Sequence, residues 1–382
     1  MKENIIYLNN GATTWPKPPE VMEAVQESLR LPYYEEGRST IKGQTDYVTE
    51  TRKALAEFFN AEIPENFSFT QNATDSLNIL IHGFVKEEGA PFHVITTELE
   101  HNSVLRPLTT LENEGKITLT IVPFGPDGHI DPEEIRKAIR EDTCLAVISH
   151  GSNVLGSVQD IEAIGKILHS EEIFFIVDGA QTAGYVDIDL SALPVDAFAF
   201  TGHKGLLGLP GIGGFYIKDP ASVAPLKQGG TGIDSESRCQ NEEMPYRFEP
   251  GTHNYPGVVS LGAGIRYLKH RGQDAVRHVD EMTEYLLSEL EKEEKIIIYN
   301  RHPDLGVIAF NIEGIDNEEV GYILSRAYGI ITRSGLHCAP LVHKKIDRGM
   351  GCVRISLSCM NTMEECEVAA AAIREVARSE DC

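Results

Sequence analysis

The sequence lacks the features of a secreted, membrane-bound or disulfide-stabilised protein. None of its apolar runs is long enough to span a bilayer, and residues 1–7 contain polar side chains where a signal peptide has an apolar segment. The seven cysteines are scattered and form no Cys-x-x-Cys pair, which argues against a disulfide framework or a structural zinc site. We therefore expect a soluble, cytoplasmic protein without a metal ion.

Basic residues are also scarce. The sequence has 34 Lys+Arg against 58 Asp+Glu, which gives a formal net charge of −24 at pH 7. A field of this sign repels the phosphates of nucleic acids and the headgroups of anionic lipids. We therefore expect neither a nucleic acid nor a membrane among the partners.

The composition otherwise indicates an ordinary globular protein of two domains. Its 382 residues are 41% hydrophobic and 24% charged, and their number exceeds what one hydrophobic core usually supports. Between about residues 70 and 217, apolar runs alternate with helical patterns, which predicts an α/β fold with a mostly parallel sheet. The runs that we interpret as strands are 92–97, 117–124, 144–150, 173–178, 195–201 and 212–217.

The pattern changes after the turn-rich stretch 228–257. Long helices are predicted at about 258–271 and 274–293, and a last helix is predicted to begin at the capping box Thr362-x-x-Glu365 and to end near residue 378. Strands are expected near 295–300, 306–312, 329–333 and 352–358. We therefore expect a large domain over 21–257, a smaller α+β domain over 258–382, and an N-terminal segment, 1–20, that packs near the smaller domain.

Polar residues that directly follow strands are the first candidates for a site, because ligands of open α/β sheets bind beyond the carboxyl ends of the strands. Asp178 ends one apolar run, and Lys204 follows another just before a glycine-rich stretch. Taken singly, Asp178 could equally cap a helix, and a lysine after a strand is more often a solvated charge. A lysine amine in a partly desolvated pocket can instead form an imine with a carbonyl compound.

A third candidate is the start of the helix predicted after Phe69. Small and hydroxyl residues, among them Ala73 and Thr74, open this helix, and the exposed N–H groups of a helix N-terminus suit a phosphate. An ordinary N-cap explains the same residues nearly as well. Likewise, His101 alone fits the start of a helix in Glu100-His101-Asn102-Ser103.

Taken together and in order, these blocks resemble class V aminotransferases, specifically the cysteine desulfurase and selenocysteine lyase branch. The resemblance begins at residues 7–14 and extends to the last helix. The blocks that show it are Asn72-Ala73-Thr74, Glu100-His101, Asn153, Asp178-Gly179-Ala180-Gln181, Thr201-Gly202-His203-Lys204 and Gly251-Thr252-His253-Asn254.

The resemblance implies a fold-type I enzyme that uses pyridoxal 5'-phosphate (PLP) and is usually a homodimer with active sites near the subunit interface. It implies that Lys204 binds PLP covalently, that Asp178 pairs with the pyridine nitrogen, that His101 stacks on the ring and that Gln181 binds the phenolic oxygen. Thr252 is expected to reach the phosphate of the neighbouring subunit's cofactor. The full set expected to bind the cofactor is Ala73, Thr74, His101, Asn153, Asp178, Gln181, Thr201, His203, Lys204 and Thr252, with Thr74, Thr201 and His203 at the phosphate.

A second distinctive block, residues 332–340, looks like the short catalytic loop of group II cysteine desulfurases. A lone cysteine is usually a small buried hydrophobe, but Gly335 and Pro340 bracket Cys338 in a turn-prone segment where a thiol is more accessible. The resemblance makes Cys338 a catalytic residue beside Lys204 and His101. The sequence leaves open whether His337 or a cofactor-bound group activates its thiol.

Arg354 lies among apolar residues in the strand predicted at 352–358, where burial demands an anionic partner. The resemblance places the substrate carboxylate on Arg354, with Asn153 also at the substrate, whereas a structural ion pair is the alternative. Four departures from the family pattern weaken the substrate assignment. They are Asn9 where relatives commonly have aspartate, residues 37–40, which only loosely match the segment at the substrate entrance, Leu336 where many have a second histidine, and the insertion-like segment 341–347.

The function expected from the resemblance is PLP-dependent removal of sulfur from L-cysteine. The products are L-alanine and a persulfide on Cys338, which passes its sulfur to an acceptor, expected to be a protein. Selenocysteine cleavage is one alternative, and another class V activity (lyase, epimerase or aminotransferase) with an incidental Cys338 is a second. A noncatalytic scaffold for sulfur transfer is the non-enzyme alternative.

Overall fold

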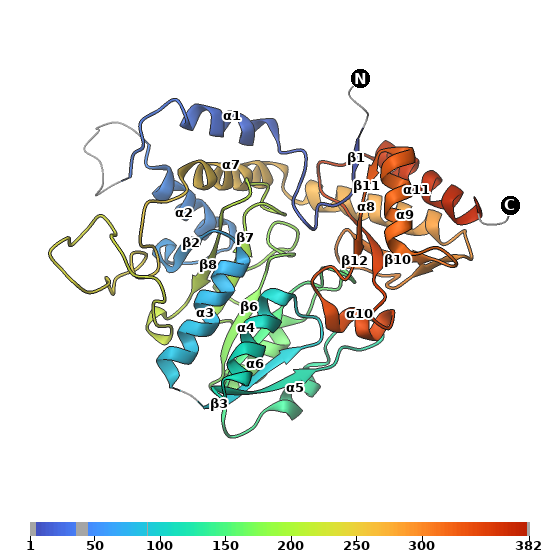
Figure 1. Ribbon diagram of the computed structural model, residues 1–382. Helices are drawn as coiled ribbons and strands as arrows, with labels where there is room; N and C mark the ends of the chain where they lie inside the picture. Colours follow the sequence, from blue (N-terminus) through green and yellow to red (C-terminus); the bar gives the residue numbers. More distant parts are fainter. Residues whose placement is uncertain (1–4, 36–44, 90, 380–382) are drawn as a thin grey trace.

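A seven-stranded sheet forms the larger part of the protein in the computed structural model, which describes residues 5–35, 45–89 and 91–379. Its strand order is β2-β8-β7-β6-β5-β3-β4 (Figure 1). The five strands from β7 to β4 are parallel, whereas β8 is antiparallel to both β7 and β2. The strands are β2 (Phe67–Thr70), β3 (Phe92–Thr97), β4 (Ile117–Val122), β5 (Thr143–Ser149), β6 (Phe174–Asp178), β7 (Ala197–Thr201) and β8 (Gly213–Ile217).

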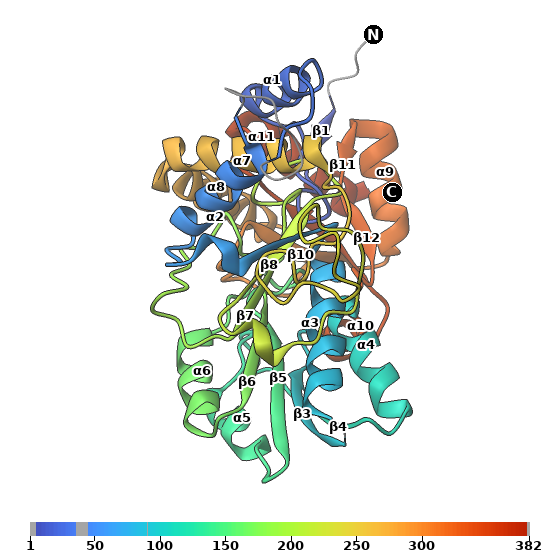
Figure 2. The same ribbon diagram turned by 90° about the vertical axis from the view of Figure 1, so that its left-hand side faces the viewer.

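The central strands are buried on both faces, as parallel strands between two helical layers must be. Successive residues of β5 belong to opposite cores: Leu145 packs with α3 (Ala73–Glu88) and α4 (Asn102–Asn113), and Ala146 packs with α6 (Ile161–Ser170). Figure 2 shows α3 and α6 on opposite sides of the strands. The predicted mostly parallel α/β sheet is thus confirmed.

A smaller, antiparallel sheet with the order β12-β13-β10-β9 lies in the C-terminal part, shown orange to red in Figure 1. Its strands are β9 (Ile296–Ile298), β10 (Val307–Ile312), β12 (Arg333–Gly335) and β13 (Cys352–Ser356). The helices of this part are α8 (Gln273–Leu290), α9 (Asn317–Tyr328), α10 (Pro340–Ile346) and α11 (Met363–Arg378), and the predicted capping box of Thr362 and Glu365 opens α11.

The N-terminal segment joins this part through β1 (Ile6–Tyr7), which pairs in parallel with β11 (Ile330–Ile331). The single strand predicted at 329–333 is therefore wrong: it is two strands, because β11 pairs with β1 whereas β12 pairs with β13.

The remaining α-helices of the described residues are α1 (Pro19–Ser28), α2 (Tyr47–Phe58), α5 (Pro132–Ala138) and α7 (Tyr255–Arg271), and α5 packs against β4 and α6. In Figure 1, α7 runs beside α1 and α2, and it also contacts α8. The division into segments 1–20, 21–257 and 258–382 stays a prediction. None of the helices in the described part of the chain has the length and apolar character that a membrane span needs.

Candidate active site

A cavity of about 270 Å³ opens at the carboxyl ends of β5, β6 and β7. Parallel strands direct their following loops to this edge, so residues far apart in the sequence meet there. Its lining includes every residue predicted for the cofactor or substrate except Thr252. These residues are Ala73, Thr74, His101, Asn153, Asp178, Gln181, Thr201, His203, Lys204 and Arg354, joined by Gly11, Ala12, Asn72, Ser103, Ser149, Gly151, Ala180 and Arg333.

Lys204 and Asp178 contribute opposite charges to the cavity. Burial lowers the pKa of the Lys204 amine to about 8, while Asp178 acts in the opposite direction. Burial also raises the pKa of Asp178, although the backbone N–H of Ala180 donates to its Oδ1 at 2.9 Å. An amine of this kind is available as a base or nucleophile near neutral pH, and the carboxylate is suited to a protonated ring nitrogen.

His101 is neutral and has a defined tautomer. Its Nδ1 accepts a hydrogen bond from the backbone N–H of Ser103 at 3.1 Å, so its proton is on Nε2. Ser103 Oγ lies 2.8 Å from the same nitrogen and 2.7 Å from Thr74 Oγ1. Burial, then Lys204, lowers the pKa of His101 to about 4. The ring is thus uncharged near neutral pH, which is compatible with stacking on an aromatic cofactor.

Besides the Nε of Arg354, two polar atoms at the cavity have no hydrogen-bond partner among the described residues. They are Thr201 Oγ1 and His203 Nδ1, both buried, and such atoms are costly unless a ligand satisfies them. The N-terminus of α3, capped by Asn72, lies at the same cavity. Gly213 permits this placement, because a Cβ there would lie 2.6 Å from Asn72 Cα. These donors fit a phosphate group, and with Lys204 and Asp178 they fit PLP.

Arg354 is almost completely buried, with 1% of its surface exposed. Its Nη1 donates to Asn153 O at 2.9 Å and its Nη2 to Asn9 Oδ1 at 3.1 Å, whereas its Nε has no partner among the described residues. No carboxylate of the described residues lies within ion-pair distance. A buried guanidinium without an anion fits the binding of a carboxylate ligand better than a structural ion pair.

Cys338 lies beside the cavity on the loop between β12 and α10. The Arg333 Nη2 is 3.6 Å from its Sγ. Its carbonyl accepts a hydrogen bond from the backbone N–H of Asn102 at 2.7 Å, and the carbonyl of His337 accepts one from Asn153 Nδ2 at 2.7 Å. The loop is thus fixed to the start of α4 and to the segment after β5, with a cation next to the thiol. Gln181, also in the cavity lining, donates from its Nε2 to Gly11 O at 3.3 Å.

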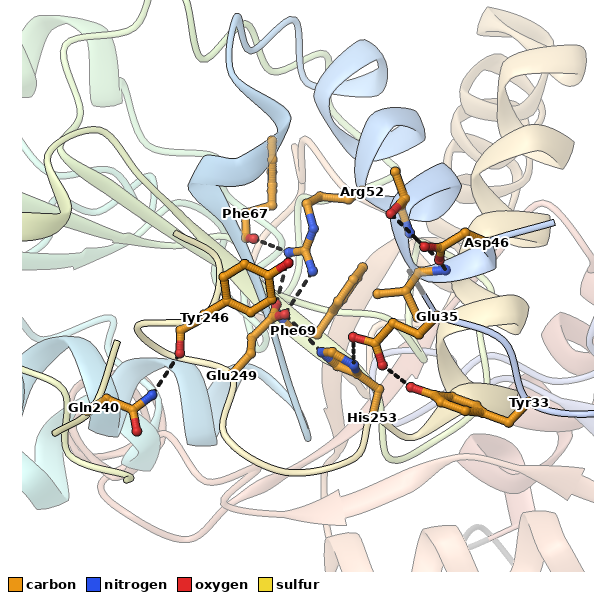
Figure 3. Close-up of polar contacts among 12 residues, drawn as sticks. Tyr33, Glu35, Asp46, Arg52, Phe67, Phe69, Gln240, Tyr246, Glu249 and His253 are labelled. Atoms are coloured by element: carbon orange, nitrogen blue, oxygen red, sulfur yellow. Dashed lines mark hydrogen bonds and ion pairs between the residues drawn. The ribbon is translucent and has the colours of Figure 1, made fainter. Parts of the chain in front are cut away.

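Thr252 lies outside the cavity, exposed in a second hollow. A buried ionic cluster, shown in Figure 3, holds its neighbour His253. The Glu249 carboxylate accepts from Arg52 Nη2 at 2.8 Å and from His253 Nε2 at 2.8 Å, and Glu35 lies 3.3 Å from His253 Nδ1. The cluster therefore anchors the loop that presents Thr252 at the protein surface.

Sequence reasoning missed three polar residues of the cavity, which are Arg333, Ser103 and Ser149, the last residue of β5. Arg333 lies in the catalytic block, but the sequence did not show that its guanidinium, on β12, contacts the Cys338 thiol. Ser103 lies two residues after His101 and fixes its tautomer. The one available signal for Ser103 was its position in the first turn of a helix that begins at a candidate site residue.

The fold and the cavity together are those of a fold-type I PLP-dependent enzyme: a large, mostly parallel sheet with a lysine, an aspartate and the N-terminus of α3 at one edge. The chain belongs to the aminotransferase class-V family, whose model matches residues 6–368. Similar proteins include a probable cysteine desulfurase of Methanothermobacter thermautotrophicus, 34% identical over 97% of this chain and 94% of that protein.

Two further comparisons agree with this assignment. A cysteine desulfurase of Escherichia coli is 31% identical over 94% of this chain and 90% of its own length. The apo structure of a cysteine desulfurase from Thermococcus onnurineus superposes with a TM-score of 0.87 at 31% identity, covering 98% of this chain and 95% of that chain.

Proposed function

We propose that this protein is a cysteine desulfurase that converts L-cysteine to L-alanine and a persulfide on Cys338. The observation that supports this most directly is the Cys338 thiol, 3.6 Å from Arg333 Nη2 at the edge of the cavity that contains Lys204. A scaffold has no need for a thiol next to a cavity that contains an amine of lowered pKa, and relatives named cysteine desulfurase match nearly the whole chain.

PLP would be held by Lys204, by Asp178 at its ring nitrogen, by His101 on its ring face, by Gln181 at its phenolic oxygen and by phosphate donors around the start of α3. The phosphate donors are Ala73, Thr74, Thr201 and His203. When bound, the cofactor supplies an electron sink for the pair of electrons that remains when a Cα–H bond breaks.

Arg354 and Asn153 would orient the substrate. The buried guanidinium binds the substrate carboxylate, and its hydrogen bonds to Asn153 and Asn9 hold the fork in place. This directs the Cα–H bond towards Lys204. With its pKa lowered to about 8, the Lys204 amine accepts the Cα proton and returns one later in the reaction.

The Cys338 thiolate would then attack the sulfur of the substrate. A sulfur–sulfur bond forms as the Cβ–S bond breaks, and the electron pair of the broken bond takes up a proton at Cβ to give alanine. Arg333, whose Nη2 lies 3.6 Å from the Cys338 sulfur, would orient that sulfur for the attack. The persulfide on Cys338 passes its sulfur to an acceptor.

Release of alanine and sulfide from L-cysteine, in the presence of a thiol reductant, tests this function. Wild-type protein, Cys338→Ala and a control, Cys239→Ala at an exposed cysteine, are compared at equal PLP occupancy. We expect equal amounts of both products from the wild type and the control and none from Cys338→Ala. Equal activity in all three would indicate another class V reaction with an incidental Cys338.

Selenocysteine provides a second arm of the same experiment. Its weaker carbon–selenium bond makes the thiol less necessary, so a Cys338→Ser protein that cleaves selenocysteine but not cysteine indicates use of both substrates. Loss of both activities in this variant would count against use of both substrates.

We also propose a homodimer and a protein that accepts the sulfur, in the cytoplasm. The exposure of Thr252 supports the homodimer, because a residue outside the cavity of its own subunit can reach another subunit. The partial exposure of Cys338 supports a protein acceptor, because such a partner has to reach the thiol.

A further inference from the structure

Three buried polar residues lie beneath the loop that bears Cys338. His343 is in α10, Asp347 ends that helix, and His337 directly precedes Cys338. All three are buried: His343 is 0% exposed, His337 2% and Asp347 4%. The proposed reaction gives none of their side chains a task. We refer to these three residues as the histidine relay.

The relay is a continuous line of hydrogen bonds. Asp347 Oδ2 is 2.6 Å from His343 Nδ1, and His343 Nε2 is 3.2 Å from His337 Nδ1. His337 Nε2 is 3.1 Å from the carbonyl oxygen of Arg333. The other carboxylate oxygen of Asp347 accepts from the backbone N–H of Gly349 at 2.9 Å.

The two ends of this line fix the number of protons in it. The Arg333 carbonyl can only accept, so His337 Nε2 is protonated. If His337 is neutral, its Nδ1 accepts, and His343 Nε2 must be protonated as well. A proton is then also needed between His343 Nδ1 and Asp347, because two facing lone pairs at 2.6 Å repel. Three hydrogen bonds therefore need three protons, one more than two neutral imidazoles provide.

We propose that the histidine relay holds this third proton and that the resulting hydrogen bonds position Arg333 and Cys338 for reaction. The proton lies between His343 and Asp347, as an imidazolium–carboxylate pair without net charge. His337 is the neutral member: burial, then Arg354, lowers the pKa of His337 to about 3. The charged groups that face it are Arg333 and Arg354, and the Cys352 thiol of β13 lies 4.0 Å from its Nδ1.

The backbone explains why the loop needs such support. His337 and Cys338 have φ angles of +50° and +58°, a left-handed backbone conformation that residues other than glycine rarely adopt. The ring of His337 connects this strained pair to the carbonyl of Arg333, whose guanidinium lies 3.6 Å from the thiol. His337 and His343 are thus positioning residues for the contact between cation and thiol. This role rests on the proposed function of Cys338, whereas the proton count does not.

Nitrogen-15 NMR of histidine-labelled, PLP-loaded protein tests the proton count. Signals are assigned with His343→Gln and with a control, His93→Asn, at a buried histidine of β3 that bonds to Thr143 and Thr120. We expect three of the four ring nitrogens of His337 and His343 to be protonated. Two protonated nitrogens would overturn the proposal. One equivalent of bound metal in the dialysed protein would overturn it too, because the ion would replace the proton.

Alkylation of Cys338 tests the positioning role without any turnover. Iodoacetamide labelling of Cys338 is compared by peptide mass spectrometry with that of exposed Cys239 in the same sample. We expect His343→Gln to lower the Cys338/Cys239 ratio by at least about tenfold. An unchanged ratio in folded His343→Gln protein would refute the positioning role.

Asp347→Asn removes the charged pair of the histidine relay but keeps its hydrogen bonds. This variant also tests the proton count if His343→Gln does not fold. The asparagine amide can donate to His343 Nδ1, so two neutral imidazoles then complete the line. We expect two protonated nitrogens and a Cys338/Cys239 ratio close to that of the wild type. Three protonated nitrogens in this variant would overturn the proposal. If the protein lacks desulfurase activity although the number of protonated nitrogens and the Cys338/Cys239 ratio are as expected, only the proposed function is contradicted.

Discussion

Burial sets the chemistry of individual residues in the cavity, and Lys204 is the clearest case. Its amine has a pKa lowered to about 8 by burial, against the influence of Asp178. We expect covalent uptake of PLP by the cofactor-free protein, followed by absorbance, to accelerate as the pH rises through about 8, because only the unprotonated amine reacts. Asp178→Asn removes the group that raises this pKa and should move the midpoint to lower pH. A midpoint that stays in place would contradict the assignment.

Arg354 presents a second prediction at the residue scale. Arg354→Lys keeps the positive charge but loses the planar fork, so we expect kcat/KM for L-cysteine to fall by roughly 10- to 100-fold, mainly through KM. Steady-state kinetics measure the effect. The control is Arg374→Lys, because Arg374 pairs with Glu289 and neither residue lines the cavity. An equal effect of both substitutions would argue against a role of Arg354 in substrate binding.

At the scale of elements, the ionic cluster of Figure 3 joins α2 to the loop that presents Thr252. Burial opposes the charge on His253, but Glu249 and Glu35 raise the pKa of His253 to about 9. A raised pKa means that this charge stabilises the fold fully below about pH 6.5 and that the stabilisation disappears as the pH rises through about 9.

We therefore expect the free energy of unfolding to fall by roughly 1–3 kcal/mol between these pH values, beyond the change seen in His253→Gln. Urea unfolding at a series of pH values measures it. An exposed histidine variant, His302→Gln, should keep the wild-type slope. Parallel slopes in the wild type and His253→Gln would exclude a charged His253.

Strands of the large sheet were predictable because each is an apolar run bounded by polar turns. The predicted strand 92–97 agrees with β3 (Phe92–Thr97) in both ends, and 173–178 differs from β6 (Phe174–Asp178) by one residue. The prediction was wrong at 329–333. The β-branched residues 330–332 continue without a break, although the pairing partner changes from β1 to β13 within this segment. Pairing partners far apart in the sequence leave no local signal.

At the scale of the whole molecule, the exposed Thr252 gives a prediction about assembly. If Thr252 serves the neighbouring subunit, neither Lys204→Ala nor Thr252→Asp alone should be active. A hybrid of one subunit of each kind has one intact site and one doubly impaired site. We expect activity to return when the two inactive variants are denatured and refolded together. No recovery, with hybrids confirmed by native mass spectrometry, would place Thr252 in its own subunit's site or outside catalysis.

The sequence by itself determined the residue types of the site and their order along the chain. Asp178, Lys204 and Cys338 were identifiable because strand ends, glycine-rich turns and family motifs are local in the sequence. Only the tertiary structure decided that Arg354 has no acidic partner among the described residues, that Ser103 sets the tautomer of His101 and that His343 and Asp347 lie beneath Cys338. These facts depend on which side chains share a buried space, and burial and pairing arise when distant segments pack together.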